Sequence, residues 1–139
     1  MTYLYYAKGV FAAFATACMT SFVLGTREKP RSIPYKVVSA LLLAQLGVDR
    51  RFQGCGLGSE LVADFNQFAR ELSASVGCRY VILDAQPDLV PWYEKQGFAT
   101  NQAMQRQRID AWTAENRDMA TLSVSMRLDL RAPRRARAA

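Results

Sequence analysis

Three glycines within five residues separate an apolar run from a segment with helical spacing, and this feature most constrains the fold. Gly54, Gly56 and Gly58 follow "VVSALLLAQLGV", whose Val and Leu content predicts a buried strand. Beyond them, apolar residues recur every three or four positions, at Leu57, Leu61, Phe65, Phe68, Leu72 and Val76. That spacing is typical of an amphipathic helix. The sequence therefore predicts a strand, a glycine loop and a helix in direct succession.

A glycine loop in front of a helix is suited to binding an anion. A helix N-terminus exposes unpaired N–H groups and carries partial positive charge. Glycines before it let the backbone bend and let a ligand approach closely. A turn that only reverses the chain needs fewer glycines. The favoured interpretation is therefore a phosphate or pyrophosphate site.

The rest of the chain indicates a single α/β domain over residues 1–130, as its length of 139 residues suggests. The other expected elements are a hairpin of "YLYY" and "VFAAFATACMTSFVL", a strand in "CRYVILDA", a short helix in "DLVPWYEKQG" that Asp88 caps, and a final strand in "MATLSVSMRLDL". Residues 100–118 fit a strand, a loop or a helix equally well. Residues 131–139 are basic and are expected to form a disordered tail rather than an RNA-binding arm.

Composition excludes several kinds of chemistry. The chain has no histidine, so Ser-His-Asp and Cys-His catalysis are absent and a metal site is not expected. Cys18, Cys55 and Cys78 form no CxxC pair, which favours a reduced, cytoplasmic setting. The uncharged stretch 9–25 could be a signal segment, but it is short for a membrane span, and a strand is the preferred interpretation. A formal charge of +6 favours anionic partners.

The glycine loop matches one family better than the two general nucleotide motifs. No lysine precedes Ser59, so the P-loop pattern fails, and the dinucleotide pattern GxGxxG is not met, although Asp84 keeps it as a weak alternative. "QGCGLG" resembles the Q/R-x-x-G-x-G/A signature of the GNAT acyltransferases. "LVPWYEKQGF" resembles their second motif, in which a helix tyrosine precedes a Gly-Phe pair. The resemblance to this family is strong over residues 36–98.

The resemblance implies a fold and a reaction. The fold would be a mixed, mostly antiparallel sheet with a splayed central strand pair flanked by helices. Acetyl-CoA would transfer its acetyl group to a primary amine, and Tyr93 would protonate the leaving thiolate. No base can be named, and Glu94 or a water chain remains open. The residues implied to bind acetyl-CoA are Leu46, Val48, Gln53, Gly54, Cys55, Gly56, Leu57, Gly58, Ser59 and Gln86.

The start of the chain departs from the family pattern. "YLYYAKG" resembles the family's second strand, so the first strand and the two helices that wall the acceptor site are not expected in this sequence. Three alternatives stay open: the wall is missing, a second subunit supplies it, or the chain is a fragment. Apolar surface exposed in this way favours self-association and a homodimer. Arg50 and Arg51 either add charge near the coenzyme phosphates or face solvent.

The link "GTREKPRSIPYK" narrows the resemblance to the GNAT-type toxins of bacterial toxin–antitoxin pairs, which acetylate aminoacyl-tRNA. Arg27, Lys29, Arg31 and Lys36 would then form a phosphate-facing patch, with an antitoxin as partner; a solvated basic loop is the equal alternative. Two other functions stay open. One is acetylation of a small-molecule or peptide amine without RNA contact. The other is an inactive acyl-CoA-binding or interaction module.

Overall fold

The computed structural model describes residues 1–132, which form a six-stranded sheet in the order β1-β2-β3-β4-β6-β5. The strands are β1 (Thr2–Ala7), β2 (Val10–Val23), β3 (Val37–Val48), β4 (Tyr80–Ala85), β5 (Ala99–Thr100) and β6 (Val124–Asp129). The helices are α1 (Leu57–Val76), α2 (Val90–Lys95) and α3 (Gln102–Ala114). Neighbouring strands are antiparallel except β3 and β4, so the expected mostly antiparallel sheet is confirmed.

The uncharged stretch near the N-terminus lies in a β-hairpin, as preferred from the sequence. β1 and β2 pair antiparallel, and Ala7 lies opposite Val10. Lys8 and Gly9 between them have φ of 49° and 78°, the left-handed conformation of a two-residue hairpin turn. No helix within residues 1–132 is both long and apolar enough to cross a membrane.

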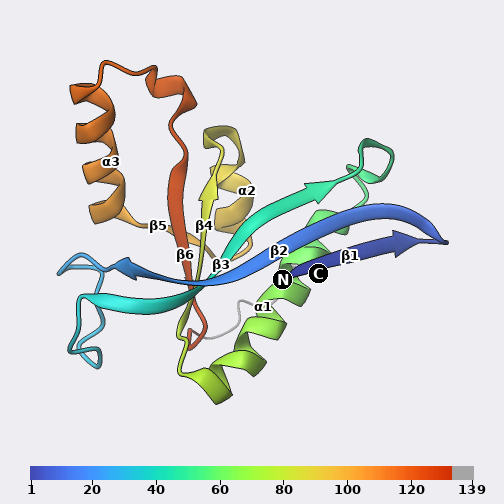
Figure 1. Ribbon diagram of the computed structural model, residues 1–139, viewed down its shortest axis with the longest axis horizontal. Coiled ribbons are helices and arrows are strands. Elements are labelled where there is room, and N and C mark those ends of the chain that lie inside the picture. Colours follow the sequence, from blue (N-terminus) through green and yellow to red (C-terminus); the bar gives the residue numbers. More distant parts are fainter. Residues whose placement is uncertain (133–139) are drawn as a thin grey trace.

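The central parallel pair is splayed, which opens the middle of the sheet. β3 pairs with β4 only over Ala40, Leu41 and Leu42. β3 then continues to Val48 along β2 alone, and Figure 1 shows it turning away from β4. A bulge accompanies the bend: Thr16 lies opposite Gln45 and Ala17 opposite Leu43, so β3 has one extra residue between them. Within residues 1–132, the backbone edge of β3 beyond the bulge therefore has no strand partner on the β4 side.

The two faces of the sheet have separate cores. On one face, α1 contributes Val62, Phe65 and Ala69 to a cluster that also contains Tyr93 and Phe98. On the other face, a smaller cluster around Phe22 and Tyr80 is covered by Met104 of α3 and by Ile33 of the β2–β3 loop. Figure 1 shows α1 running beneath the hairpin while α3 stands apart from it. The loop and α3 thus belong to the face opposite α1.

Three local expectations need correction or completion. Asp88 does not cap α2: it lies in a 3-10 turn, Pro87–Leu89, and α2 begins after Leu89 with no side-chain cap. The last strand starts only at Val124, because Met119–Thr121 form a 3-10 turn. Asp118 caps this turn by accepting a hydrogen bond from the amide of Ala120. The ambiguous segment contains α3. Most of the predicted disordered tail, 133–139, lies outside the described residues.

Candidate active site

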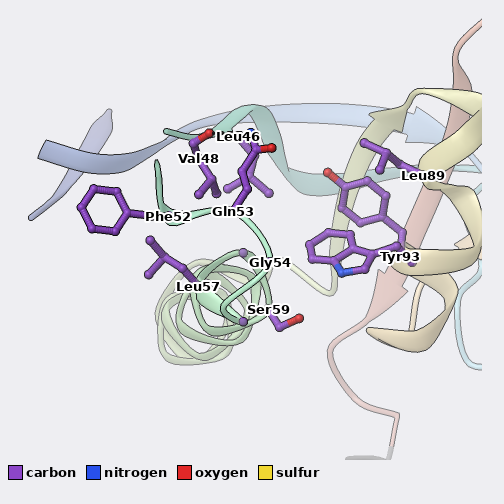
Figure 2. A pocket seen from close by; sticks show the side chains of 12 residues that line it. Leu46, Val48, Phe52, Gln53, Gly54, Leu57, Ser59, Leu89 and Tyr93 are labelled. Carbon is purple, nitrogen blue, oxygen red and sulfur yellow. Dashed lines mark hydrogen bonds between the residues drawn. The ribbon is translucent and has the colours of Figure 1, made fainter. Parts of the chain in front are cut away.

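A pocket of about 500 Å³ opens where β3, the glycine loop, α1 and α2 meet (Figure 2). Its lining residues are Leu46, Val48, Phe52, Gln53, Gly54, Gly56, Leu57, Gly58, Ser59, Leu89, Trp92 and Tyr93. Nine of the eleven site residues predicted from the sequence are among them. Cys55 and Gln86 are not; the Cys55 thiol instead donates to the carbonyl of Phe52 at 2.7 Å.

The N-terminus of α1 is open toward this pocket. Gly56 is its N-cap residue, has φ of 86° and offers no side chain to cap the helix. Among residues 1–132, no acceptor pairs with the amides of Leu57, Gly58 or Ser59. The N-terminus of α3, by contrast, is filled by the carboxylate of Glu28. The positive end of α1 is therefore available to an anionic ligand.

Gly58 has a different role from the other two glycines. It lies inside the first turn of α1 rather than in the loop before the helix. A Cβ at Gly58 would lie in van der Waals contact with Trp92, 3.4 Å from its Cζ2, so α1 and α2 lie close together at this position. Sequence reasoning missed Trp92, Phe52 and Leu89 as lining residues. Only the position of Trp92 beside Tyr93 could have indicated one of them.

Tyr93 contributes a buried phenol to the pocket. The residue is 7% exposed and packs edge-on against Trp92 and Phe98. Figure 2 shows the hydroxyl directed across the pocket toward Leu46 on β3. Burial raises the pKa of this phenol above its ordinary value, because the phenolate would be poorly solvated. The group therefore keeps its proton at neutral pH and can act as a proton donor.

Side chains just before the glycines shape the loop. Asp49 accepts from the backbone N–H of Arg51 and forms an ion pair with its guanidinium at 2.9 Å. Gln53 donates from Nε2 to the carbonyl of Val48 at 3.0 Å. The side chain of Arg50 has no ion-pair partner among residues 1–132. Of the two adjacent arginines, Arg50 is thus the one available to an anion.

A second cavity of about 490 Å³ lies near the start of α3 and the edge strand β5. Its lining includes Arg27, Glu28, Glu94, Gln102 and Arg127. Glu94, considered above as a base, lines this cavity and not the one that contains Tyr93. Within residues 1–132 there is no cluster of His, Cys, Asp and Glu that could hold a metal ion.

The splayed strand pair, the open N-terminus of α1 and the buried phenol of Tyr93 thus meet in one pocket. Residues 36–112, more than half of the chain, match the family model described as "Acetyltransferase (GNAT) domain". The chain belongs to the GNAT acetyltransferase family.

Known proteins resemble the chain over part of their length. A structure described as a bacterial toxin superposes with a TM-score of 0.67 and 21% identity, covering 88% of this chain and 62% of that one. The structure of AtaT complexed with acetyl-methionyl-tRNAfMet superposes with a TM-score of 0.62 and 26% identity, covering 68% of this chain and 58% of that one. A glucosamine 6-phosphate N-acetyltransferase of Trypanosoma brucei brucei is 41% identical over 59 residues, 42% of this chain and 37% of that protein. The chain spans less than two thirds of each of these relatives.

Proposed function

We propose that the chain transfers the acetyl group of acetyl-CoA to a primary amine, and that the favoured acceptor is the amine of aminoacyl-tRNA. Acetyl-CoA is proposed as the donor because two features lie in the same pocket. These are the uncapped N-terminus of α1 at Gly56 and the buried phenol of Tyr93. Acetyl-CoA carries a pyrophosphate and, at the far end of its pantetheine arm, a thioester, and these two groups match the two features.

Each wall of the pocket has a distinct role in the proposed reaction. The free amides of Leu57, Gly58 and Ser59 bind the pyrophosphate. The open edge of β3 at Leu46 and Val48 pairs with the pantetheine amides as another strand would. The acceptor nitrogen attacks the thioester carbonyl carbon, and the C–S bond breaks. Tyr93 donates its phenolic proton to the departing sulfur, the acylated nitrogen loses one proton to water, and solvent restores the phenol.

The basic loop, residues 25–36, supports an RNA acceptor. Arg27, Arg31 and Lys36 are exposed on it, whereas Lys29 donates to the carbonyl of Ile33. The loop is held in place because Ile33 packs into the second core and Ser32 accepts a hydrogen bond from Arg79 at 3.2 Å. Cations on an anchored loop lose little freedom when they contact phosphates. The resemblance to AtaT, whose structure contains acetyl-methionyl-tRNAfMet, supports the same acceptor.

Binding of aminoacyl-tRNA should weaken steeply with salt. Three or four phosphate contacts imply a log–log slope of roughly −3, so affinity should fall by about 50-fold or more between 50 and 200 mM salt. Filter binding across that range, combined with detection of N-acetylated aminoacyl-tRNA, measures both parts of the proposal. Acetylation that does not change with salt and is equally fast on free amino acid esters would contradict an RNA acceptor.

A small amine is the second candidate acceptor. The 41% identity to a glucosamine 6-phosphate N-acetyltransferase favours it, although the match covers only 59 residues. Such an acceptor also carries a phosphate, so a basic surface fits it as well. Competition assays with amino sugars and aminoacyl-tRNA distinguish the two, because the RNA contacts alone extend over many phosphates.

The proposal also includes two protein partners, a second copy of the chain and an antitoxin. The proposed setting is the reducing cytoplasm, which is consistent with three cysteines that form no disulfide. Leu4, Tyr6 and Phe11 are exposed on the hairpin, which favours a homodimer. The resemblance to AtaT, a toxin that also occurs bound to the C-terminus of the antitoxin AtaR, favours an antitoxin partner. Analytical ultracentrifugation of the chain, alone and with the product of the neighbouring gene, tests both. A chain that sediments as a monomer and does not bind the second protein would contradict both proposed partners.

A further inference from the structure

The carboxylate of Glu28 joins the basic loop to α3 through four hydrogen bonds. Oε1 accepts from the amides of Gly25 at 3.3 Å and Ala103 at 3.1 Å. Oε2 accepts from the amide of Gln102 at 2.9 Å and from Nη1 of Arg127 at 2.7 Å. The side chain is 9% exposed. Although burial opposes ionisation, the amides and Arg127 hold the pKa of this carboxyl below its usual value.

The start of α3 depends on this contact from a distant part of the chain. α3 has no buried residue, so packing alone holds it weakly. Its N-cap residue, Asn101, makes no capping bond and instead donates to Ser125 Oγ at 2.9 Å. Glu28, which lies 74 positions earlier in the sequence than Gln102, satisfies the first-turn amides in its place. The loop and the helix are therefore positioned by the same side chain.

Glu28 is also the anchor nearest to Arg27. Arg27 lines the second cavity beside Glu28, and its side chain has no ion-pair partner among residues 1–132. The other side-chain contacts that anchor the loop, at Ser32 and Ile33, lie several residues after Arg27 in the sequence. Gly25 permits the arrangement, because a Cβ there would lie 2.7 Å from Oε1 of Glu28 and 2.8 Å from Cβ of Ala103.

We propose that Glu28 is a positioning residue for the acceptor: it holds Arg27 and the rest of the basic loop in the arrangement that contacts RNA phosphates. This inference rests on the proposed RNA acceptor. For the RNA affinity of a variant without Glu28, it predicts the opposite of what net charge alone predicts. Removing an acidic group beside a basic loop should strengthen RNA binding if only net charge matters. If Glu28 positions the loop, its removal should weaken binding, because the cations lose their fixed geometry.

The first test is Glu28→Gln, which keeps the size of the side chain and removes its charge. With tRNA as the probe, affinity should fall about tenfold and the salt slope should decrease by roughly one unit, as for the loss of one phosphate contact. Acetyl-CoA affinity should not change, because Glu28 lies outside that pocket. The matched control is Asp110→Asn, an equal charge change at an exposed residue of α3 whose carboxylate has no partner among residues 1–132. It should leave tRNA affinity unchanged or slightly raised.

A second variant separates position from charge. Gly25→Ala places a methyl group against Glu28 and Ala103 and displaces the carboxylate without altering any charge. It should weaken tRNA binding as Glu28→Gln does, with acetyl-CoA affinity intact as proof of folding. Unchanged or tighter tRNA binding by either variant overturns the inference, even if thermal stability falls. If the unaltered protein shows no salt-sensitive tRNA binding, the RNA acceptor and this inference fail together. Acetyl transfer to a small amine would still stand in that case.

Discussion

Replacing Gly56 by valine is expected to abolish acetyl-CoA binding. The residue has φ of 86°, and a left-handed conformation costs an L-residue about 1–2 kcal/mol, with a β-branched side chain at the upper end or beyond. The free loop is expected to relax out of this conformation, so the cost must be met again on binding and lowers affinity roughly tenfold. Among residues 1–132, no atom lies within 4 Å of a Cβ at this position, so the added group would project into open space at the mouth of the pocket. There it would obstruct the ligand, and the total loss should exceed about 100-fold by titration calorimetry.

Gly77→Val is the matched control for this prediction. Gly77 ends the same helix with φ of 66°, and a Cβ at this position would likewise have no atom within 4 Å. The backbone cost is therefore similar, but it falls at the far end of α1. This variant should lose stability and keep its affinity for acetyl-CoA. Retained binding by Gly56→Val, or equal loss in both variants, would remove the glycine loop from the site.

Replacing Tyr93 by phenylalanine should lower kcat by about 100-fold or more, the usual contribution of a positioned general acid. Acetyl-CoA affinity should stay nearly constant, because the ring keeps its contacts with Trp92 and Phe98 and only the hydroxyl is lost. Steady-state kinetics and calorimetry on the same variant separate the two effects. Equal losses in turnover and affinity would make Tyr93 a packing residue.

The pH dependence offers an independent check on Tyr93. Burial raises the pKa of this phenol, so the protonated, active form persists at neutral and mildly alkaline pH. The rate should fall only at a pH above the ordinary pKa of a phenol, and Tyr93→Phe should lack that alkaline limb. Tyr80→Phe is the control: burial also raises the pKa of Tyr80, which lies in the other core. That change should leave the alkaline limb of kcat unaltered.

Local patterns were sufficient to predict most of the residues that line the pocket. The glycines, the apolar stripe of α1 and the tyrosine before Gly-Phe are short-range signals, because each depends on neighbours within one or two helical turns. α3 shows the limit. Its apolar residues do not form a strong stripe, and its first turn is completed by Glu28 from another loop. No window of sequence around α3 contains that information.

The order and type of residues were enough to specify a strand, a glycine turn and a helix in succession, with a phenol on a second short helix. Backbone conformation and periodicity are local properties, so neighbouring residues encode them directly. The width of the opening in the sheet, the set of side chains in one pocket, and the contact between the basic loop and α3 emerged only in three dimensions. Those outcomes depend on a bulge in β3, on the closeness of Gly58 to Trp92 and on a carboxylate bound across the fold. Each joins segments far apart in the chain, where packing rather than local preference sets the geometry.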